Sequence, residues 1–167
     1  MLTGRNALRE QREFSRLIVS GGALFAFGLL AGLIYTFALI GQIEVWPLPW
    51  HITLASYWDA DAWRRAHVGS LMNAIVVLVF ASAAKAISLP DSSWFPFALC
   101  VQATAWLNST AFVLAAILGV RGLSGNGSET NLVVYLLFLM AVITAFIQSW
   151  LLARHAWYFG HSTQVGS

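Results

Sequence analysis

Four long apolar runs constrain the fold of this 167-residue sequence more than any other feature. They cover residues 17–40, 67–87, 94–118 and 132–152. About 20 apolar residues are enough for a helix to cross the hydrocarbon core of a bilayer, so each run can span it. A transmembrane β-barrel would need apolar and polar residues in alternation, whereas these runs are continuous. We therefore predict an all-α integral membrane protein, a four-transmembrane-helix bundle that forms a single membrane domain over residues 1–167.

The composition supports this fold class and excludes several others. Only 10% of the residues are charged, against about a quarter in soluble domains. The net charge of +2 is small and scattered, so no nucleic-acid partner is expected. Cys100 is the only cysteine, which excludes an intrachain disulfide and a cysteine-rich metal cage. The eight tryptophans are typical of membrane proteins that place aromatic side chains at the lipid interface.

The basic residues are divided unequally between the two sides of a four-span protein. One side carries Arg5, Arg9, Arg12, Arg16, Lys85 and Arg154. The other side carries Arg64, Arg65 and Arg121. Lys and Arg are enriched on the cytoplasmic side of membrane proteins, so we predict a multi-pass topology with both termini in the cytoplasm.

Polar side chains inside the apolar runs are candidates for a functional site, because polar groups are costly at membrane depth. Interhelical hydrogen bonding is the simpler interpretation for five of them: Ser70, Ser109, Thr110, Thr144 and Gln148. Asn73 and Asn108 lie deeper and fit a site equally well. In the first run, Gly21, Gly28 and Gly32 form a ridge of small residues, which predicts close packing of a neighbouring helix.

His67 is the candidate metal ligand, at the predicted start of the second span. Neutral imidazole is a common metal ligand, and haem iron needs at least one strong axial ligand. His155 ends the fourth run, so about 30 Å of hydrocarbon core should separate the two histidines. That separation argues against a bis-histidine haem. His67 alone would suit a haem with an open position, and a headgroup location without any ligand is the alternative.

Several motifs resemble the bacterial styrene oxide isomerase family, in order along the chain from the first connection onward. They are Ile43-Glu44-Val45-Trp46-Pro47, Trp63-x-Arg65-Ala66-His67-x-Gly69-x-x-x-Asn73, Trp106-x-Asn108 and Arg121-Gly122-Leu123. The second motif is the most specific. The stretch Gly28-Leu29-Leu30-Ala31-Gly32 is also similar to the related arylhydroxylamine (hydroxylaminobenzene) mutases.

The resemblance implies a homotrimer in the bacterial inner membrane that binds haem b through His67, with Trp106 near the same pocket. The ferric iron would accept the oxygen of a lipophilic aryl epoxide and act as a Lewis acid. Ring opening to a benzylic cation and a 1,2-hydride shift would then give an aryl acetaldehyde. Asn73 matches the asparagine that positions the substrate, and Asn108 and Phe112 match other pocket positions. Besides the epoxide, membrane lipids are the expected partners.

Two positions depart from the family pattern. Phe112 stands where the isomerases have a substrate-orienting tyrosine, and Thr104 stands where they have an aspartate. Because the tyrosine hydroxyl is missing, an arylhydroxylamine mutase on the same scaffold is the alternative function. A non-enzymatic haem-binding membrane subunit or a small transporter is the third hypothesis. Proton-coupled transporters usually place an acid at mid-membrane, and none of the four runs has a central Asp or Glu.

Overall fold

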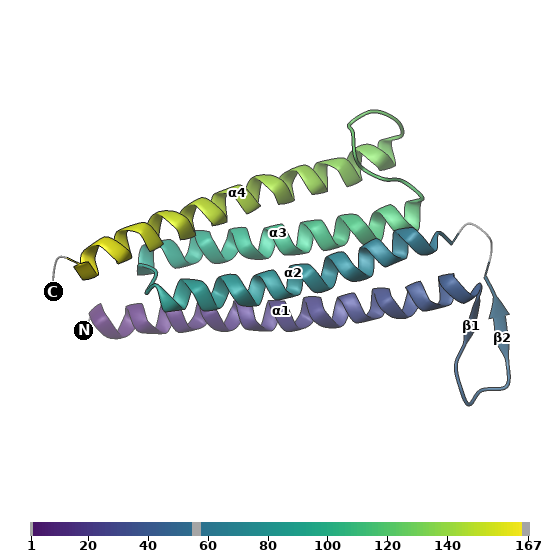
Figure 1. The fold of residues 1–167 in the computed structure, drawn as a ribbon, viewed down its shortest axis with the longest axis horizontal. Coiled ribbons are helices and arrows are strands. Elements are labelled where there is room, and N and C mark those ends of the chain that lie inside the picture. The colour runs from purple at the N-terminus through teal and green to yellow at the C-terminus, as the bar shows by residue number, and fades with distance from the viewer. Residues whose placement is uncertain (1, 55–57, 165–167) are drawn as a thin grey trace.

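The computed structural model describes residues 2–54 and 58–164, with side chains described for residues 8–54 and 58–159. It contains four long helices, α1 (Leu2–Ile40), α2 (Ala60–Ala86), α3 (Asp91–Leu118) and α4 (Glu129–Gln164) (Figure 1). A short antiparallel hairpin, β1 (Gln42–Glu44) with β2 (His51–Thr53), lies between α1 and α2. Each helix includes a segment long and apolar enough to cross a membrane. The predicted all-α, four-span fold is therefore confirmed, and the chain is a multi-pass membrane protein.

The helices extend beyond the apolar runs. α2 begins at Ala60, so His67, the predicted start of the second span, lies about two turns inside the helix. The Asp59 side chain caps this end by accepting a hydrogen bond of 2.9 Å from the Asp61 backbone N–H. Arg64 and Arg65 interrupted the apolar run, but charged side chains do not end a helix.

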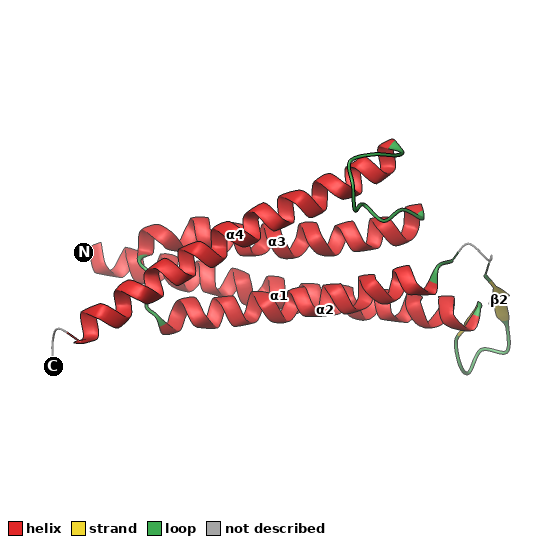
Figure 2. Cartoon of the chain, turned by 45° about the horizontal axis from the view of Figure 1, so that its top comes forward, coloured by secondary structure: helices red, strands yellow, loops and turns green. Residues whose placement is uncertain are grey.

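Consecutive helices run in opposite directions and pack in sequence order. α1 lies along α2, α2 along α3, and α3 along α4, with a further contact between α1 and α3. The two chain ends consequently lie at the same end of the bundle (Figure 1). α4 runs at a clear tilt to the other helices (Figure 2). The hairpin and the α3–α4 connection lie at the opposite end.

Small residues hold α1 and α2 close together, as the glycine ridge predicted. A Cβ atom added at Gly28 would lie 2.8 Å from Leu71 Cδ2 and 3.1 Å from the Leu71 backbone nitrogen. A Cβ atom added at Gly21 would lie 2.7 Å from Leu78 Cδ2. The inward face of α2 is itself rich in alanine, including Ala66, Ala74 and Ala81. These side chains let the helix backbones approach each other closely.

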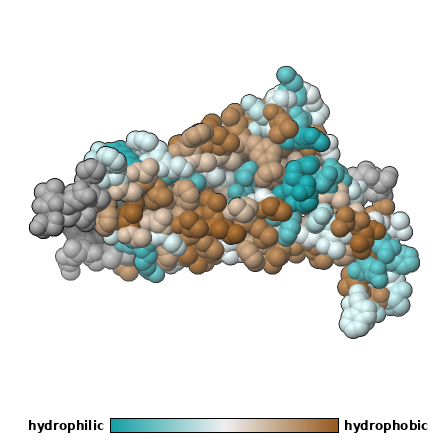
Figure 3. All heavy atoms as spheres, viewed as in Figure 1, coloured by the Kyte–Doolittle hydropathy of each residue, from teal (hydrophilic) through white to brown (hydrophobic). Residues whose placement is uncertain are grey.

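The outer surface of the bundle is apolar in its middle. Large apolar side chains are exposed on all four helices, such as Leu30, Val79, Leu99 and Phe146. On the face shown in Figure 3, apolar residues cover most of the middle, and hydrophilic residues gather mainly toward the ends. Apolar side chains exposed on all four helices fit contact with lipid rather than water.

The predicted division of basic residues agrees with the arrangement of the helices. Arg9, Arg12, Arg16, Lys85 and Arg154 belong to the helix ends that lie with the two chain ends. The side chain of Arg5 lies outside the described residues. Arg64, Arg65 and Arg121 belong to the opposite end.

Substitution of Gly28 by alanine should destabilise the bundle, because the new methyl group would clash with Leu71. We expect Gly28→Ala to lower the free energy of unfolding by about 1–3 kcal/mol, as overpacking does. Gly22→Ala is the matched control, because nothing lies within 4 Å of a Cβ at Gly22. Unfolding in one detergent would measure both variants. Equal losses for the two variants would show that close packing does not occur at Gly28.

Candidate functional site

His67 is held against the backbone of α1. Its Nδ1 atom lies 2.8 Å from the carbonyl oxygen of Gly28. A carbonyl oxygen can only accept, so Nδ1 must carry the proton that is donated. In the neutral ring, this leaves the lone pair on Nε2. Metal-ligating histidines typically donate their other ring N–H to a backbone carbonyl or carboxylate in this way.

The imidazole of His67 is packed over a second glycine. A Cβ atom added at Gly32 would lie 2.5 Å from His67 Nδ1 and 2.7 Å from His67 Cε1. Any larger residue at Gly32 would therefore displace the ring. On the same part of α2, Val68 and Met72 are 50% and 55% exposed, on faces about 100° and 140° around the helix from His67. His67 thus combines a fixed ring with an available Nε2.

A histidine ring in this arrangement could serve as the single axial ligand of a haem. Among the described residues, no group of three or more His, Cys, Asp or Glu side chains is placed to hold a metal ion. His155 lies near the opposite end of the bundle, with its Nε2 atom 3.0 Å from Ser93 Oγ of α3. The separation of His67 from His155 agrees with the expectation that the two do not share a haem.

Asn73 is the centre of a buried hydrogen-bond network between α2 and α3. Its Nδ2 donates to Ser109 Oγ at 2.9 Å, and its Oδ1 accepts from Asn108 Nδ2 at 3.2 Å. Asn73 is 9% exposed and Ser109 is fully buried. Both ends of the Asn73 amide are therefore fixed in orientation. One N–H and one acceptor lone pair of that amide stay available for another group.

Phe112 lies about one turn from Asn108 on α3 and packs against α2 and α4. A Cβ atom added at Gly69 would lie 2.6 Å from Phe112 Cε2, so the ring covers the α2 backbone there. Its centroid is 5.0 Å from that of Phe138, in an edge-to-face arrangement. Both rings line a cavity of about 140 Å³ that also includes Arg65 and Arg121.

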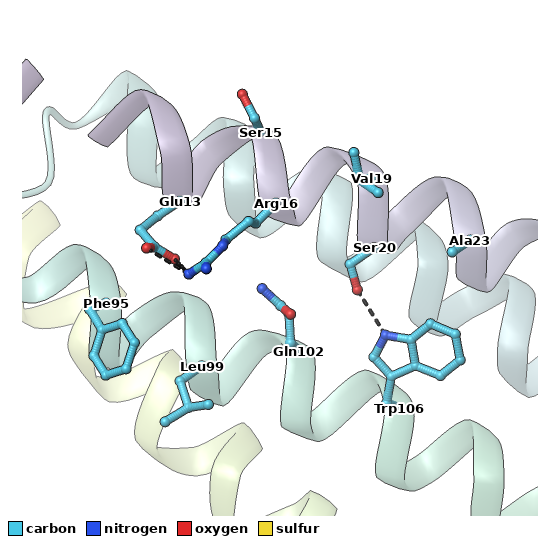
Figure 4. Close-up of a pocket in the computed structure, with 10 residues that line it drawn as sticks. All are labelled: Glu13, Ser15, Arg16, Val19, Ser20, Ala23, Phe95, Leu99, Gln102 and Trp106. Carbon is cyan, nitrogen blue, oxygen red and sulfur yellow. Dashed lines mark hydrogen bonds and ion pairs between the residues drawn. The ribbon is translucent and has the colours of Figure 1, made fainter. Parts of the chain in front are cut away.

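Trp106 faces a different region of the bundle. Its Nε1 donates to Ser20 Oγ of α1 at 2.9 Å, and its ring lies 5.9 Å from that of Phe27 (Figure 4). Residues 20 and 27 lie on a stripe of α1 about 100° from Gly28, which holds His67. The structure thus joins Asn73 to Asn108 but does not bring Trp106 to His67 within the chain. The role of Trp106 in a haem pocket stays a prediction.

The remaining polar candidates divide into bonded and unbonded groups. Thr104 Oγ1 of α3 donates to Thr144 Oγ1 of α4 at 2.8 Å, which confirms the predicted interhelical hydrogen bonding of Thr144. The bond from Asn73 confirms it for Ser109. Among the described residues, Ser70 Oγ and Gln148 Oε1 are buried without a hydrogen-bond partner, so the structure does not show the predicted interhelical bonds of these two atoms. The sequence reasoning missed the Gly28 carbonyl, because a backbone acceptor leaves no side-chain signal. The only sequence signal for this contact was the pair of glycines, Gly28 and Gly32, that face His67.

Loss of the Ser109 hydroxyl should destabilise the protein, because Asn73 Nδ2 would lose its acceptor. We expect Ser109→Ala to lower the free energy of unfolding by about 0.6–2 kcal/mol, the range for interhelical hydrogen bonds in membranes. Ser70→Ala is the control, because Ser70 is equally buried but its hydroxyl has no hydrogen-bond partner in the described part of the chain. We expect no loss in that variant. A loss at Ser70 as large as that at Ser109 would contradict the assigned network.

Comparisons with known proteins identify the family of the chain. The sequence matches the family described as styrene oxide isomerase over residues 13–157. A comparison with curated proteins gave no match. The matched range begins within α1 and ends within α4, and it contains His67, Asn73 and Asn108. Because the match covers most of the chain, this multi-pass membrane protein belongs to the styrene oxide isomerase family.

Proposed function

We propose that this chain is a haem b-dependent isomerase that converts lipophilic aryl epoxides, such as styrene oxide, to aryl acetaldehydes. Membership of the family supports isomerase activity in general. The haem assignment rests on one observation, the hydrogen bond of 2.8 Å between His67 Nδ1 and the Gly28 carbonyl. This bond leaves Nε2 as the ligand atom and prevents rotation of the ring.

His67 would hold the iron, and the α1 backbone would hold His67. The Gly28 carbonyl orients the imidazole and raises its basicity as a ligand. Gly32 gives the ring the space to lie flat against α1. A bound ferric haem would supply a Lewis acid that polarises the epoxide oxygen.

Asn73 would position the substrate through the part of its amide that the network leaves available. Asn108 and Ser109 fix the plane of this amide from α3. A hydrogen-bonding group that is already oriented does not need to be ordered when the substrate binds, so more of its binding energy acts on the reaction. In this assignment, Asn73 touches the substrate, and Asn108 and Ser109 are positioning residues.

The apolar interior would protect the positive charge that develops at the benzylic carbon. Exclusion of water prevents capture of this carbon by a water molecule, which would give a diol instead of an aldehyde. Aromatic ring faces attract positive charge. Phe112 supplies such a ring one turn along α3 from Asn108, and Phe138 of α4 supplies a second ring against it. Phe112 lacks the hydroxyl group of the tyrosine in the isomerases. Phenylhydroxylamine is therefore the second substrate to assay, because it tests the alternative function of an arylhydroxylamine mutase.

We also propose that the protein is a homotrimer in the bacterial inner membrane with both termini in the cytoplasm. Five described basic side chains at the end with the termini support this orientation. The exposed apolar side chains of Val68 and Met72, on the same part of α2 as His67, support coverage of this helix by lipid or by another subunit. Lipophilic substrates can enter such a site from the bilayer.

Replacement of His67 should remove haem and activity together. We expect the detergent-purified protein to show a Soret band, and His67→Ala to lose both this band and turnover of styrene oxide, because the haem would lose its proposed axial ligand. His155→Ala is the control, because His155 lies at the other end of the bundle. Absorption spectra, measured after expression with ample haem, test the assignment.

Two outcomes would contradict the haem site. One is a stoichiometric Soret band retained in His67→Ala. The other is a wild-type protein that folds, is expressed with ample haem and shows no Soret band.

Replacement of Asn73 should affect turnover without affecting haem. We expect Asn73→Ala to keep its Soret band and to lower kcat/KM for styrene oxide about tenfold to a hundredfold, the value of one hydrogen bond to a developing charge. Gln148→Ala is the control, since Gln148 is a buried amide of α4 whose Oε1 has no hydrogen-bond partner within residues 8–54 and 58–159. A wild-type rate in Asn73→Ala would remove Asn73 from the site.

A further inference from the structure

A groove between α1 and α3 lies apart from the proposed site. Its volume is about 660 Å³, and its lining includes Val19, Ala23, Leu99 and Trp106 (Figure 4). Most of this lining is apolar, and none of the residues that hold His67 belongs to it. Most of the groove's lining residues belong to the first halves of α1 and α3, which lie at the end of the bundle that contains the chain ends (Figure 1).

The end of this groove is basic. A second cavity of about 510 Å³ shares Glu13, Arg16 and Phe95 with the groove and adds Arg9 and Arg12. Arg16 Nη1 lies 3.0 Å and 3.2 Å from the two Glu13 carboxylate oxygens, so this buried carboxylate is neutralised. Arg9 and Arg12 are exposed and form no ion pair within the described part of the chain. Two arginines therefore present unpaired positive charge beside an apolar groove.

A polar group lies between the basic and the apolar parts. Gln102 projects from α3 into the space between the helices, near Arg16 (Figure 4). Its amide has no hydrogen-bond partner among the described side chains and backbone. The groove thus changes along its length from unpaired arginines, through an available amide, to apolar side chains. This order matches the order of an anionic phospholipid, from phosphate through ester linkage to acyl chain.

We propose that the α1–α3 groove binds one anionic phospholipid per chain, from the leaflet that surrounds the chain ends. Arg9 and Arg12 bind the phosphate, since the planar guanidinium matches phosphate geometry and is only weakly hydrated. Gln102 donates to an ester carbonyl, and an acyl chain lies along Val19 and Ala23. Membrane anchoring by scattered surface charge alone would not need an apolar groove that continues from the arginines.

Native mass spectrometry of the intact oligomer, exchanged into equimolar phosphatidylglycerol and phosphatidylcholine, tests this site. We expect wild-type protein to bind one phosphatidylglycerol per chain in preference to phosphatidylcholine. The double variant Arg9→Gln/Arg12→Gln should lose about fivefold in this preference for each arginine, the factor that corresponds to about 1 kcal/mol per basic side chain at a membrane surface. Arg16 is kept, because its loss would leave the buried Glu13 carboxylate unpaired.

Two further variants separate the groove from general charge. Arg154→Gln removes a basic side chain of α4 near the same end of the bundle but outside the groove, and should keep the preference. Ala23→Phe fills the apolar part and should abolish stoichiometric binding while the arginines stay in place. An unchanged preference in the double variant, or unchanged binding in Ala23→Phe, would overturn the proposal. A wild-type oligomer without bound lipid would also overturn it and would favour coverage of the groove by another copy of the chain.

Discussion

The close approach of α1 to α2 is the constraint on which the rest of this structure depends. Glycine at positions 28 and 32 removes the side chains that would hold the helices apart. The same closeness brings the Gly28 carbonyl within hydrogen-bond distance of His67. In a lipid environment, where burial of apolar surface does little to join helices, packing and hydrogen bonds of this kind decide which faces meet. One pair of glycines therefore serves both the fold and the candidate ligand.

The second polar network depends on α3 rather than on α1. Asn73 lies about two turns from His67 along α2, and the two side chains point to different faces of the helix. Asn73 faces Asn108 and Ser109 of α3. α2 thus carries a candidate haem ligand on one side and an oriented amide on another. This division agrees with a proposed reaction in which one residue holds the cofactor and another holds the substrate.

The α1–α3 groove shows how charge and hydropathy can be combined at the edge of a membrane protein. The ion pair with Arg16 offsets the cost of burying the Glu13 carboxylate at this depth. Arg9 and Arg12 stay available to bind a phosphate. If a phospholipid occupies the groove, it would also cover Trp106 and Ser20, whose hydrogen bond joins α1 to α3. Lipid binding would then stabilise the helix pair that has the fewest contacts with each other among the packed neighbours.

The sequence by itself determined the number of spans and the residue types of the site. Four continuous apolar runs can satisfy their backbone groups in lipid only as helices, so the fold class followed from hydropathy. Helix ends were less predictable, because Arg64 and Arg65 interrupt the apolar run without ending α2. Polar residues within the runs, such as Asn73 and Ser109, were identifiable because lipid makes them costly.

Only the tertiary structure decided which of these residues meet. A periodic pattern shows which residues share a face of one helix, but it does not specify the neighbouring helix or its vertical register. For this reason the sequence could not show whether Trp106 lies near His67 in space. The structure places Trp106 against Ser20 of α1. The Gly28 carbonyl was equally hidden, because every residue has a backbone carbonyl. Packing alone selects the one that fixes the imidazole.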